Sequence, residues 1–281
     1  MLPDFTPAQW AIAGLAAVGI GISKSGLPGI SLLHVVLFAQ LFPGIRSTGV
    51  VLPMLIAGDL GAVWLFRRHA QWPHVGRTLP PALAGVVAGW WIMGRLPAAG
   101  FGPVIGGIVL VLAVLQIARD LKPGIFREMP TSRGFAWTMG FTAGVTTMLA
   151  NAAGPVMGLY LLAVALPKDA FVGTSAWFFL LINLLKVPFS AQLGLIDLHS
   201  LTINGVLVPL ILAGLLIGRS AVARLPQRWF DILVLAFAVA AAFKLLLSPA
   251  GRHASTNPPS PAPVSPTVPT TTFPSTPPTS P

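Results

Sequence analysis

Residues 21–30 read GISKSGLPGI and interrupt two apolar stretches of the chain. A second interruption, at residues 146–155, reads TTMLANAAGP. Glycine and proline end helices, and a proline just after an interruption suits the first turn of a new helix. A helix that begins there points free N–H groups and the positive end of its dipole toward the interruption. We call residues 21–30 the first break and residues 146–155 the second break.

The sequence around the two breaks has the composition of a membrane protein. Hydrophobic residues make up 54% of the 281 residues and charged residues 9%, whereas an average soluble domain carries about 25% charged residues. So few charges cannot cover a water-facing surface, and the apolar stretches must face lipid or one another. The net charge is +10, but no basic stretch is interleaved with aromatics on a soluble module, so we expect no nucleic-acid partner.

Ten apolar segments follow one another along the chain, which predicts an all-α polytopic membrane protein. Several are shorter than the roughly 20 residues that cross a bilayer, so we expect broken or re-entrant helices in each half. The N-terminus lacks the basic residues of a signal peptide, and the first segment is expected to stay in the mature protein. The segments cover residues 8–23, 27–42, 47–66, 78–94, 101–118, 134–149, 153–166, 171–187, 201–218 and 229–247.

The second half of the chain repeats the first. At a shift of 124 positions Gly49 falls on Gly173 and Asp59 falls on Asn183. Each half has about five short segments, and an odd number inverts the second repeat relative to the first. The predicted parts are a first membrane repeat, a second membrane repeat and a disordered Pro/Ser/Thr-rich tail, at residues 1–125, 126–247 and 248–281.

The distribution of basic residues supports this topology. If the loop with Arg67, Arg68 and Arg77 is cytoplasmic, alternation of the segments places most of the 17 lysines and arginines on the same side. This bias follows the positive-inside rule. Both termini are then predicted to be extracytoplasmic.

The polar residues of the two breaks form a candidate anion site. In an inverted repeat the breaks approach the midplane from opposite sides, where such transporters bind substrate. Lys24 would add a full positive charge to the free N–H groups there. The alternatives are an ordinary turn with a snorkelling lysine, and a packing patch of small residues. The predicted substrate-binding residues are Ser23, Lys24, Ser25, Gly26, Pro28, Thr147, Asn151, Gly154 and Pro155.

Asp59 lies deep in an apolar segment, PMLIAGDLGAVW at residues 53–64. A lone carboxylate in hydrocarbon costs about 3 kcal/mol, so it must be paired, protonated or facing water. Lys24 is the expected partner. We predict that Asp59 couples transport to protons, and the alternative is a structural ion pair. We interpret Lys186 as an interfacial anchor rather than a ligand, and His34 as a residue that bonds a neighbouring helix.

The sequence offers little for catalysis. It has no cysteine, no phosphate-binding loop and no evident Ser/His/Asp or paired-carboxylate constellation, which argues against an enzyme. His69 and His74 lack a third ligand for a metal ion. We therefore predict neither a metal site nor a cofactor.

The two breaks, the second continuing as far as GPVMGLYLL, resemble the sulfite exporter TauE/SafE family. The stretch PKDAFVGTSAWFFLLINLLKVPF at residues 167–189 adds to the resemblance, which covers about residues 8–247. Many members carry a run of glycines at the first break, whereas this chain has Lys24 and its neighbours, as in a lysine-bearing branch. The resemblance implies a multi-pass carrier of the plasma membrane for sulfite, organosulfonates or related small anions.

We therefore expect a secondary transporter, an exporter of a small anion, that binds its substrate near the midplane between the breaks and is coupled to protons. One half would rock against the other. A passive anion channel and a non-transporting membrane subunit of a larger assembly are the alternatives. The expected partners are the small inorganic or organosulfur anion and the lipid bilayer, and a homo-oligomer is compatible with this function.

Overall fold

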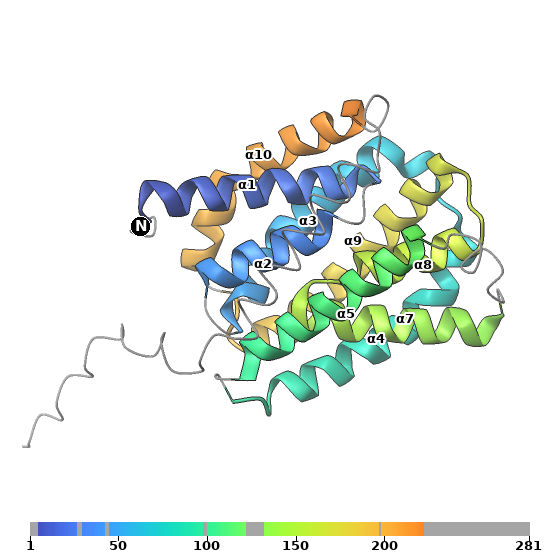
Figure 1. Cartoon of the computed structure of the whole chain (residues 1–281), viewed down its shortest axis with the longest axis horizontal. Coiled ribbons are helices and arrows are strands. Elements are labelled where there is room, and N and C mark those ends of the chain that lie inside the picture. Colours follow the sequence, from blue (N-terminus) through green and yellow to red (C-terminus); the bar gives the residue numbers. More distant parts are fainter. Residues whose placement is uncertain are drawn as a thin grey trace, which may run out of the picture.

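The computed structural model describes residues 5–26, 30–42, 45–97, 100–121, 132–196 and 198–221, and all regular structure within them is helical (Figure 1). The predicted all-α class is confirmed. The tenth predicted segment, at 229–247, and the tail lie outside the described residues. The helices are α1 (Pro7–Lys24), α2 (Ser31–Leu41), α3 (Arg46–Phe66), the 3-10 turn η2 (Arg67–His69), α4 (Trp72–Met93), α5 (Phe101–Leu121), α7 (Arg133–Ala150), α8 (Gly154–Ala163), α9 (Lys168–Gln192) and α10 (Leu198–Ala221).

The helices have the length and surface of a membrane protein. Four of those described are long and apolar enough to cross a bilayer, at Arg46–His69, Phe101–Ala118, Lys168–Gln192 and Ser200–Ser220. Large apolar side chains also cover the outside, among them Trp64, Val111 and Leu216, each more than half exposed. A surface of this kind is stable against lipid and would aggregate in water.

The two shortest helices fold back on the helices that precede them, as the sequence predicted. With 11 and 10 residues, α2 and α8 each extend only about 15 Å. In Figure 1, α1 begins at one end of the bundle and α7 begins at the opposite end.

Local sequence fixes both ends of the hairpins. Thr6 caps α1 in a capping box with Gln9, and the side chain of Ser132 caps α7, because these oxygens accept from the otherwise unpaired first N–H groups. At the inner ends, Asn151 closes α7 with φ 53° and Gly26 follows α1 with φ 105°. Asparagine and glycine are the residues that adopt this left-handed region most readily.

Helices α3 and α9 pack against each other at the centre of the bundle. On one side α1 packs along α10, and on the other α7 packs along α4. Glycines stand at both crossings. A methyl group on Gly21 would lie 2.0 Å from the carbonyl oxygen of Ile211, and one on Gly144 would lie 1.9 Å from the carbonyl oxygen of Ala82. Larger residues would push these helices apart, so the glycines set how closely the helices approach.

Candidate functional site

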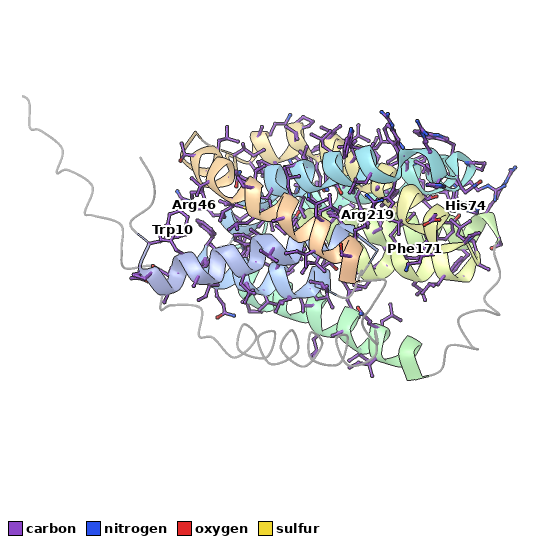
Figure 2. All side chains as sticks on the ribbon, turned by 90° about the horizontal axis from the view of Figure 1, so that it is seen from above. Trp10, Arg46, His74, Phe171 and Arg219 are labelled. Carbon is purple, nitrogen blue, oxygen red and sulfur yellow. The ribbon has the colours of Figure 1, made fainter. Side chains whose placement is uncertain are left out.

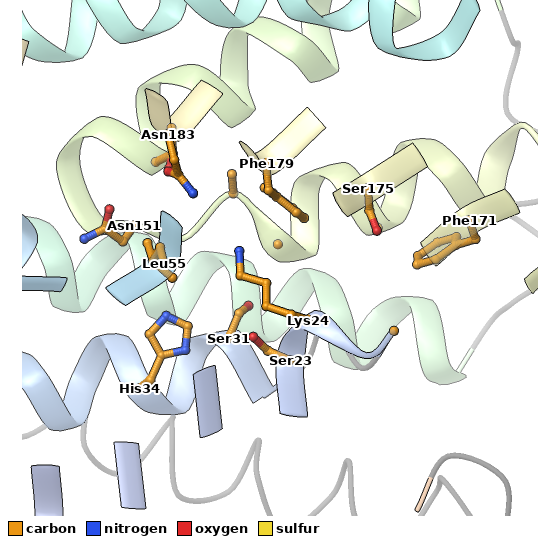
Figure 3. Close-up of a pocket in the computed structure, with 15 residues that line it drawn as sticks. Ser23, Lys24, Ser31, His34, Leu55, Asn151, Phe171, Ser175, Phe179 and Asn183 are labelled. Carbon is orange, nitrogen blue, oxygen red and sulfur yellow. The ribbon is translucent and has the colours of Figure 1, made fainter. Parts of the chain in front are cut away.

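A cavity lies where the tips of the two hairpins meet α3 and α9 (Figure 3). Its volume is about 40 Å³. A single water needs at least about 10–15 Å³, so the cavity has room for a small oxyanion. The cavity is lined by three predicted residues from each break, namely Ser23, Lys24, Gly26, Thr147, Asn151 and Gly154.

The other predicted substrate-binding residues do not line this cavity. Ser25 is buried, donates its hydroxyl to the carbonyl of Ile22 at 2.7 Å and faces Gly218 of α10. Pro155 lies in the first turn of α8, behind Gly154. Pro28 lies outside the described residues.

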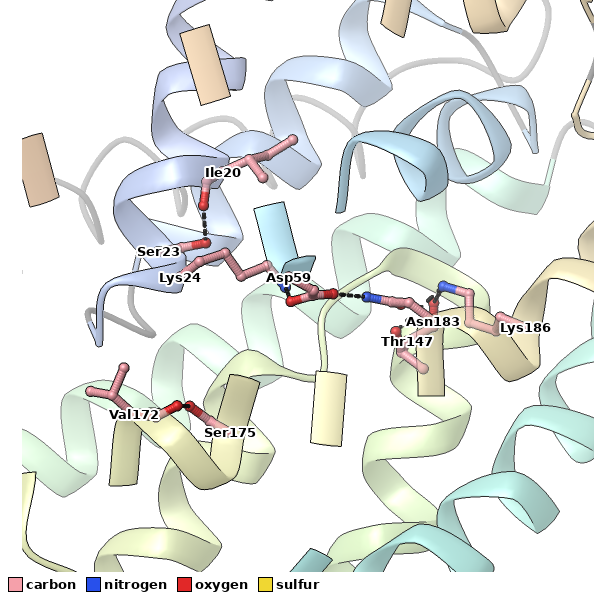
Figure 4. Close-up of polar contacts among 9 residues, drawn as sticks. All are labelled: Ile20, Ser23, Lys24, Asp59, Thr147, Val172, Ser175, Asn183 and Lys186. Carbon is pink, nitrogen blue, oxygen red and sulfur yellow. Dashed lines mark hydrogen bonds and ion pairs between the residues drawn. The ribbon is translucent and has the colours of Figure 1, made fainter. Parts of the chain in front are cut away.

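An ion pair within the first half, joined to the second half by a hydrogen bond, supplies the charge of the site. Lys24 Nζ lies 2.6 Å from Asp59 Oδ1, which confirms the pairing expected from the sequence. On the other side of the carboxylate, Asn183 Nδ2 donates to Oδ2 at 2.7 Å (Figure 4). Asp59 is fully buried, whereas the Lys24 side chain is 9% exposed. Since an ammonium has three N–H donors, the pairing with Asp59 leaves donors of Lys24 for a ligand in the cavity.

The cavity also offers Lys24 an aromatic face. Lys24 Nζ lies 4.6 Å from the ring centroid of Phe179, a distance at which the ring attracts the cation. Phe171, Phe179 and Leu55 form much of the apolar lining. A ligand with one charged group and one apolar group would match both sides.

A second lysine holds the second break in place from behind. Lys186 Nζ donates to the carbonyl oxygen of Thr147 at 2.7 Å, to Oδ1 of Asn151 at 2.5 Å and, more weakly, to Oγ1 of Thr147 at 3.4 Å. The amide nitrogen of Asn151 in turn donates to the backbone carbonyl of Thr48 in α3 at 2.9 Å. The side chain of Asn151 thus ties the second break to both central helices.

The start of α8 adds polar backbone to the cavity. No side chain caps this helix, and Ala153 and Gly154 line the cavity. The first N–H groups of a helix are unpaired and carry the positive end of its dipole. By contrast, the hydroxyl of Ser23 donates to the carbonyl of Ile20 at 2.7 Å, so this oxygen is left as an acceptor.

Two interpretations of single residues are wrong. Lys186 is not an interfacial anchor, because only 1% of it is exposed and three oxygens surround its ammonium. His34 does not bond a neighbouring helix. It is 1% exposed, lines the cavity, and neither ring nitrogen has a hydrogen-bond partner among the described residues.

The sequence contained a signal that Lys186 faces the breaks. Asn183 and Lys186 stand three positions apart in α9, so they share a helix face, and that face points toward the breaks. Phe179 and Ser175 lie about one and two turns before Asn183 on α9 and line the cavity. For His34, Ser31 and Leu55 the sequence offered only an apolar environment.

Metal binding has no support in the part of the chain that the structure describes, where no group of three or more His, Asp or Glu side chains could hold an ion. His69 and His74 do not converge on a common ligand. His74 Nδ1 instead lies 2.9 Å from the hydroxyl of Tyr160 and so links α4 to α8.

One comparison with known proteins identifies relatives. The sequence model of the family described as sulfite exporter TauE/SafE matches residues 12–245, which is most of the chain. No individual curated protein matches the sequence of this chain.

Proposed function

Since the chain belongs to the sulfite exporter TauE/SafE family, whose members are membrane transporters of sulfite or related anions, we propose that it exports such an anion from the cell as a secondary transporter. The observation that carries this proposal is the ammonium of Lys24 in a small cavity between the two breaks. Interrupted helices with polar groups at membrane depth are the usual substrate sites of secondary transporters.

The anion would be bound by Lys24 and by the first N–H groups of α8. These groups come from opposite halves of the chain, and both reach the cavity. The hydroxyl of Thr147 also lines it, whereas Asn151 acts mainly by holding the second break. Binding by both halves at once lets the anion favour one relative orientation of the halves over another, as alternating access requires.

The two halves would be inverted repeats, at about residues 1–125 and 126–247. In support, helix contacts occur in matching pairs. In each pair, the two helices of one contact correspond to the two helices of the other, with the halves of the chain exchanged. Gly85 of α4 approaches the carbonyl of Phe141 in α7 as Gly214 of α10 approaches that of Val18 in α1. Gly214 lies 129 positions after Gly85, which is also the distance from GRLP at residues 94–97 to ARLP at residues 223–226, and Phe141 lies 123 positions after Val18.

The contacts of the central helices α3 and α9 form a matching pair of the same kind. A methyl group on Gly49 of α3 would lie 2.2 Å from the carbonyl oxygen of Leu195, just beyond α9, and one on Gly173 of α9 would lie 2.7 Å from that of Phe66, at the end of α3. Asp59 and Asn183, which are 124 positions apart, contact each other directly. An axis relating the halves would therefore pass close to this hydrogen bond.

The cavity would be loaded from the cytoplasm. It extends along α9 to Phe171, which lies at the same end of the bundle as His74, opposite Trp10 and Arg46 (Figure 2). Arg67, Arg68 and Lys168 also belong to the Phe171 end, because they begin or end the helices there. The positive-inside rule makes this end cytoplasmic and puts the N-terminus outside.

Asp59 would couple export to protons. An anion that binds Lys24 competes with the carboxylate for the same ammonium. Two negative groups around one positive charge are costly in a site of low dielectric constant. A proton on Asp59 relieves this cost, so the uptake and release of that proton can be linked to binding.

Flux of labelled sulfite through proteoliposomes, with and without a pH gradient, tests this function. The proposal predicts sulfite flux that a proton gradient accelerates. Flux that is indifferent to the gradient would instead indicate a passive channel. No flux of sulfite or of an organosulfonate would favour a membrane subunit that needs a partner.

A further inference from the structure

We infer that the tips of the two hairpins are the two gates of the cavity. Gly26, at the tip of the α1–α2 hairpin, closes one end against Val172 of α9. Asn151, at the tip of the α7–α8 hairpin, closes the other end against Thr48 of α3. We call these the first and the second tip contact. The inference rests on the proposed function and deepens it, because alternating access requires a gate on each side of the substrate.

The two tip contacts occupy equivalent places in the chain. Each hairpin reaches the first turns of the central helix that belongs to the other half, since Val172 is the fifth residue of α9 and Thr48 is the third residue of α3. Val172 lies 124 positions after Thr48, and Asn151 lies 125 positions after Gly26. The proposed repeat therefore relates one contact to the other, as expected of two gates that open in turn.

The cavity lies between the two tip contacts. Its lining includes Gly26 and Phe171, the residue before Val172, and it includes Asn151 from the second break. Figure 3 shows Phe171 and Asn151 on opposite sides of Lys24. An anion that binds Lys24 would therefore have one tip contact on each side, and its route to either side of the membrane would run past one of them.

The two contacts face different sides of the membrane. Phe171 lies at the end of the bundle that the positive-inside rule makes cytoplasmic, opposite Arg46 (Figure 2). Thr48 stands two positions after Arg46, in the first turn of α3. The first tip contact is therefore the cytoplasmic gate, and the second tip contact is the extracytoplasmic gate.

The exposure of the lining side chains differs in the same direction. Ser175, whose hydroxyl donates to the carbonyl of Val172 at 2.9 Å, is half-buried, as is Phe171. Both lie toward the first tip contact. Thr147 and Asn151, at the second break, are buried. The cavity is thus sealed more completely at the second tip contact than at the first.

The two contacts are also held by different forces. Asn151 Nδ2 donates to the carbonyl oxygen of Thr48 at 2.9 Å, and Lys186 Nζ donates to Oδ1 of the same side chain. Glycine has no side chain that could form such bonds. A methyl group on Gly26 would lie 2.7 Å from Cγ2 of Val172, so the backbone of the first tip rests on this side chain. Separating that packing costs less than breaking two buried hydrogen bonds, and the first tip contact opens more readily.

Labelling of a single cysteine from each side of the membrane tests the two gates, since the chain has no cysteine of its own. Ser175→Cys is the reporter, because Ser175 lines the cavity and the substitution exchanges only oxygen for sulfur. The reagent is trimethylammonioethyl methanethiosulfonate, which does not cross membranes. It is added to right-side-out and to inside-out vesicles that contain the full-length protein, and the labelling rate is measured from each face.

Val172→Ala removes the two methyl groups on which the first tip rests. Added to Ser175→Cys, it should accelerate labelling from the cytoplasmic face by about tenfold and leave the rate from the other face unchanged. Val109→Ala is the matched control, since Val109 is a buried valine of α5 that does not line the cavity. It should leave both rates unchanged.

Asn151→Gly removes the side-chain bonds of the second tip and keeps a residue that adopts φ 53° freely. It should accelerate labelling of Ser175→Cys from the extracytoplasmic face by about tenfold and leave the rate from the cytoplasmic face unchanged. If Asn151→Gly does not fold, Asn151→Asp replaces it. The carboxylate lacks the N–H donor to Thr48 and keeps an oxygen for Lys186.

Acceleration from opposite faces in the two variants would support the gates. Acceleration from the same face in both, or unchanged labelling in either one, would overturn them. Sulfite flux in proteoliposomes of the wild type separates this failure from failure of the proposed function. Flux together with same-face labelling would overturn the gates alone, whereas opposite-face labelling without flux would support the gates and contradict sulfite as the substrate.

Discussion

The two breaks have equivalent places in the fold and different chemistry. At the first break Lys24 stands at the tip of its own hairpin, faces the cavity and is paired with a carboxylate. At the second break the ammonium of Lys186 comes from α9, lies behind the hairpin and is paired with the neutral oxygens of Thr147 and Asn151. In the proposed transporter, the first break would contribute the positive charge that binds the anion, and the second break would contribute backbone N–H groups that Lys186 and Asn151 hold in position.

We interpret this difference as a division of roles, in which Lys24 binds the substrate and Lys186 holds the second break in position. A charge at the cavity surface can bind an anion and release it. A charge enclosed by three oxygens keeps its partners in place and acts on the ligand only through its field. If this division is right, substitutions at the first break should change transport more than stability, and substitutions at the second break should change both.

The largest effect is expected for Lys24→Ala. The variant loses the ammonium that binds the anion, so sulfite flux should fall by about 100-fold or more, as for the loss of a buried charge pair of about 3–5 kcal/mol. Flux in proteoliposomes, normalised to the amount of inserted protein, measures it. Lys168→Ala is the matched control, since Lys168 is exposed at the start of α9.

The carboxylate left behind in Lys24→Ala could destabilise the fold, so the double variant Lys24→Ala/Asp59→Asn is measured beside it. The double variant should regain stability in a thermal-unfolding assay and still fail to transport. Unchanged flux in Lys24→Ala would show that the first break does not bind the anion.

Asp59→Asn should have the next largest effect. The amide cannot take up a proton, so the acceleration of sulfite flux by a pH gradient should disappear, and the flux that remains should fall by about tenfold. The flux ratio with and without the gradient is the readout. If the ratio keeps its wild-type value, Asp59 forms a structural ion pair and does not couple protons.

Lys186→Met should reduce transport less than Lys24→Ala does, and it should also lower the stability of the fold. Methionine removes three hydrogen bonds and leaves Oδ1 of Asn151 without its donor, which should lower the free energy of unfolding by about 1–3 kcal/mol. Thermal unfolding in detergent reports the change, and flux should fall less than in Lys24→Ala. A larger loss of flux than in Lys24→Ala would reverse the roles assigned to the two lysines.

The smallest expected difference is the difference in stability between two substitutions of the same residue, Asn151 in the second break. Asn151 has φ 53°, which glycine adopts freely and alanine adopts at a cost of about 1–2 kcal/mol. Both Asn151→Gly and Asn151→Ala lose the side-chain bonds to α3 and α9. Asn151→Ala should therefore unfold at a lower temperature than Asn151→Gly, and equal stabilities would mean that the break does not depend on this backbone conformation.

Much of this arrangement could be predicted from the sequence, because it depends on local chemistry. Gly26 follows α1 at the first break, and Pro155 begins α8 at the second. The short segments that follow the breaks became α2 and α8, and the isolated Asp59 has Lys24 as its partner. The shift of 124 positions also placed Asp59 opposite Asn183, and these two residues are hydrogen-bonded.

The roles of Lys186 and His34 could not be read in this way. Lys186 follows an apolar run near the end of a predicted segment, a position typical of interfacial anchors, and only its hydrogen bonds to Thr147 and Asn151 show that it is enclosed. His34 lies in an apolar helix, and its unpaired ring becomes evident only when the cavity beside it is known. The role of Lys186 depends on contacts with residues 35 and 39 positions away, and the place of His34 depends on a cavity that several segments form together. No local pattern encodes either.

Diffraction from crystals of the full-length protein grown with selenite, a heavier analogue of sulfite, tests the central claim most directly. The account predicts an anomalous selenium peak between the two breaks and next to Gly154, with a selenite oxygen accepting a hydrogen bond from Lys24 Nζ. Selenium bound only elsewhere, with Lys24 turned into bulk solvent and remote from Asn151, would contradict it.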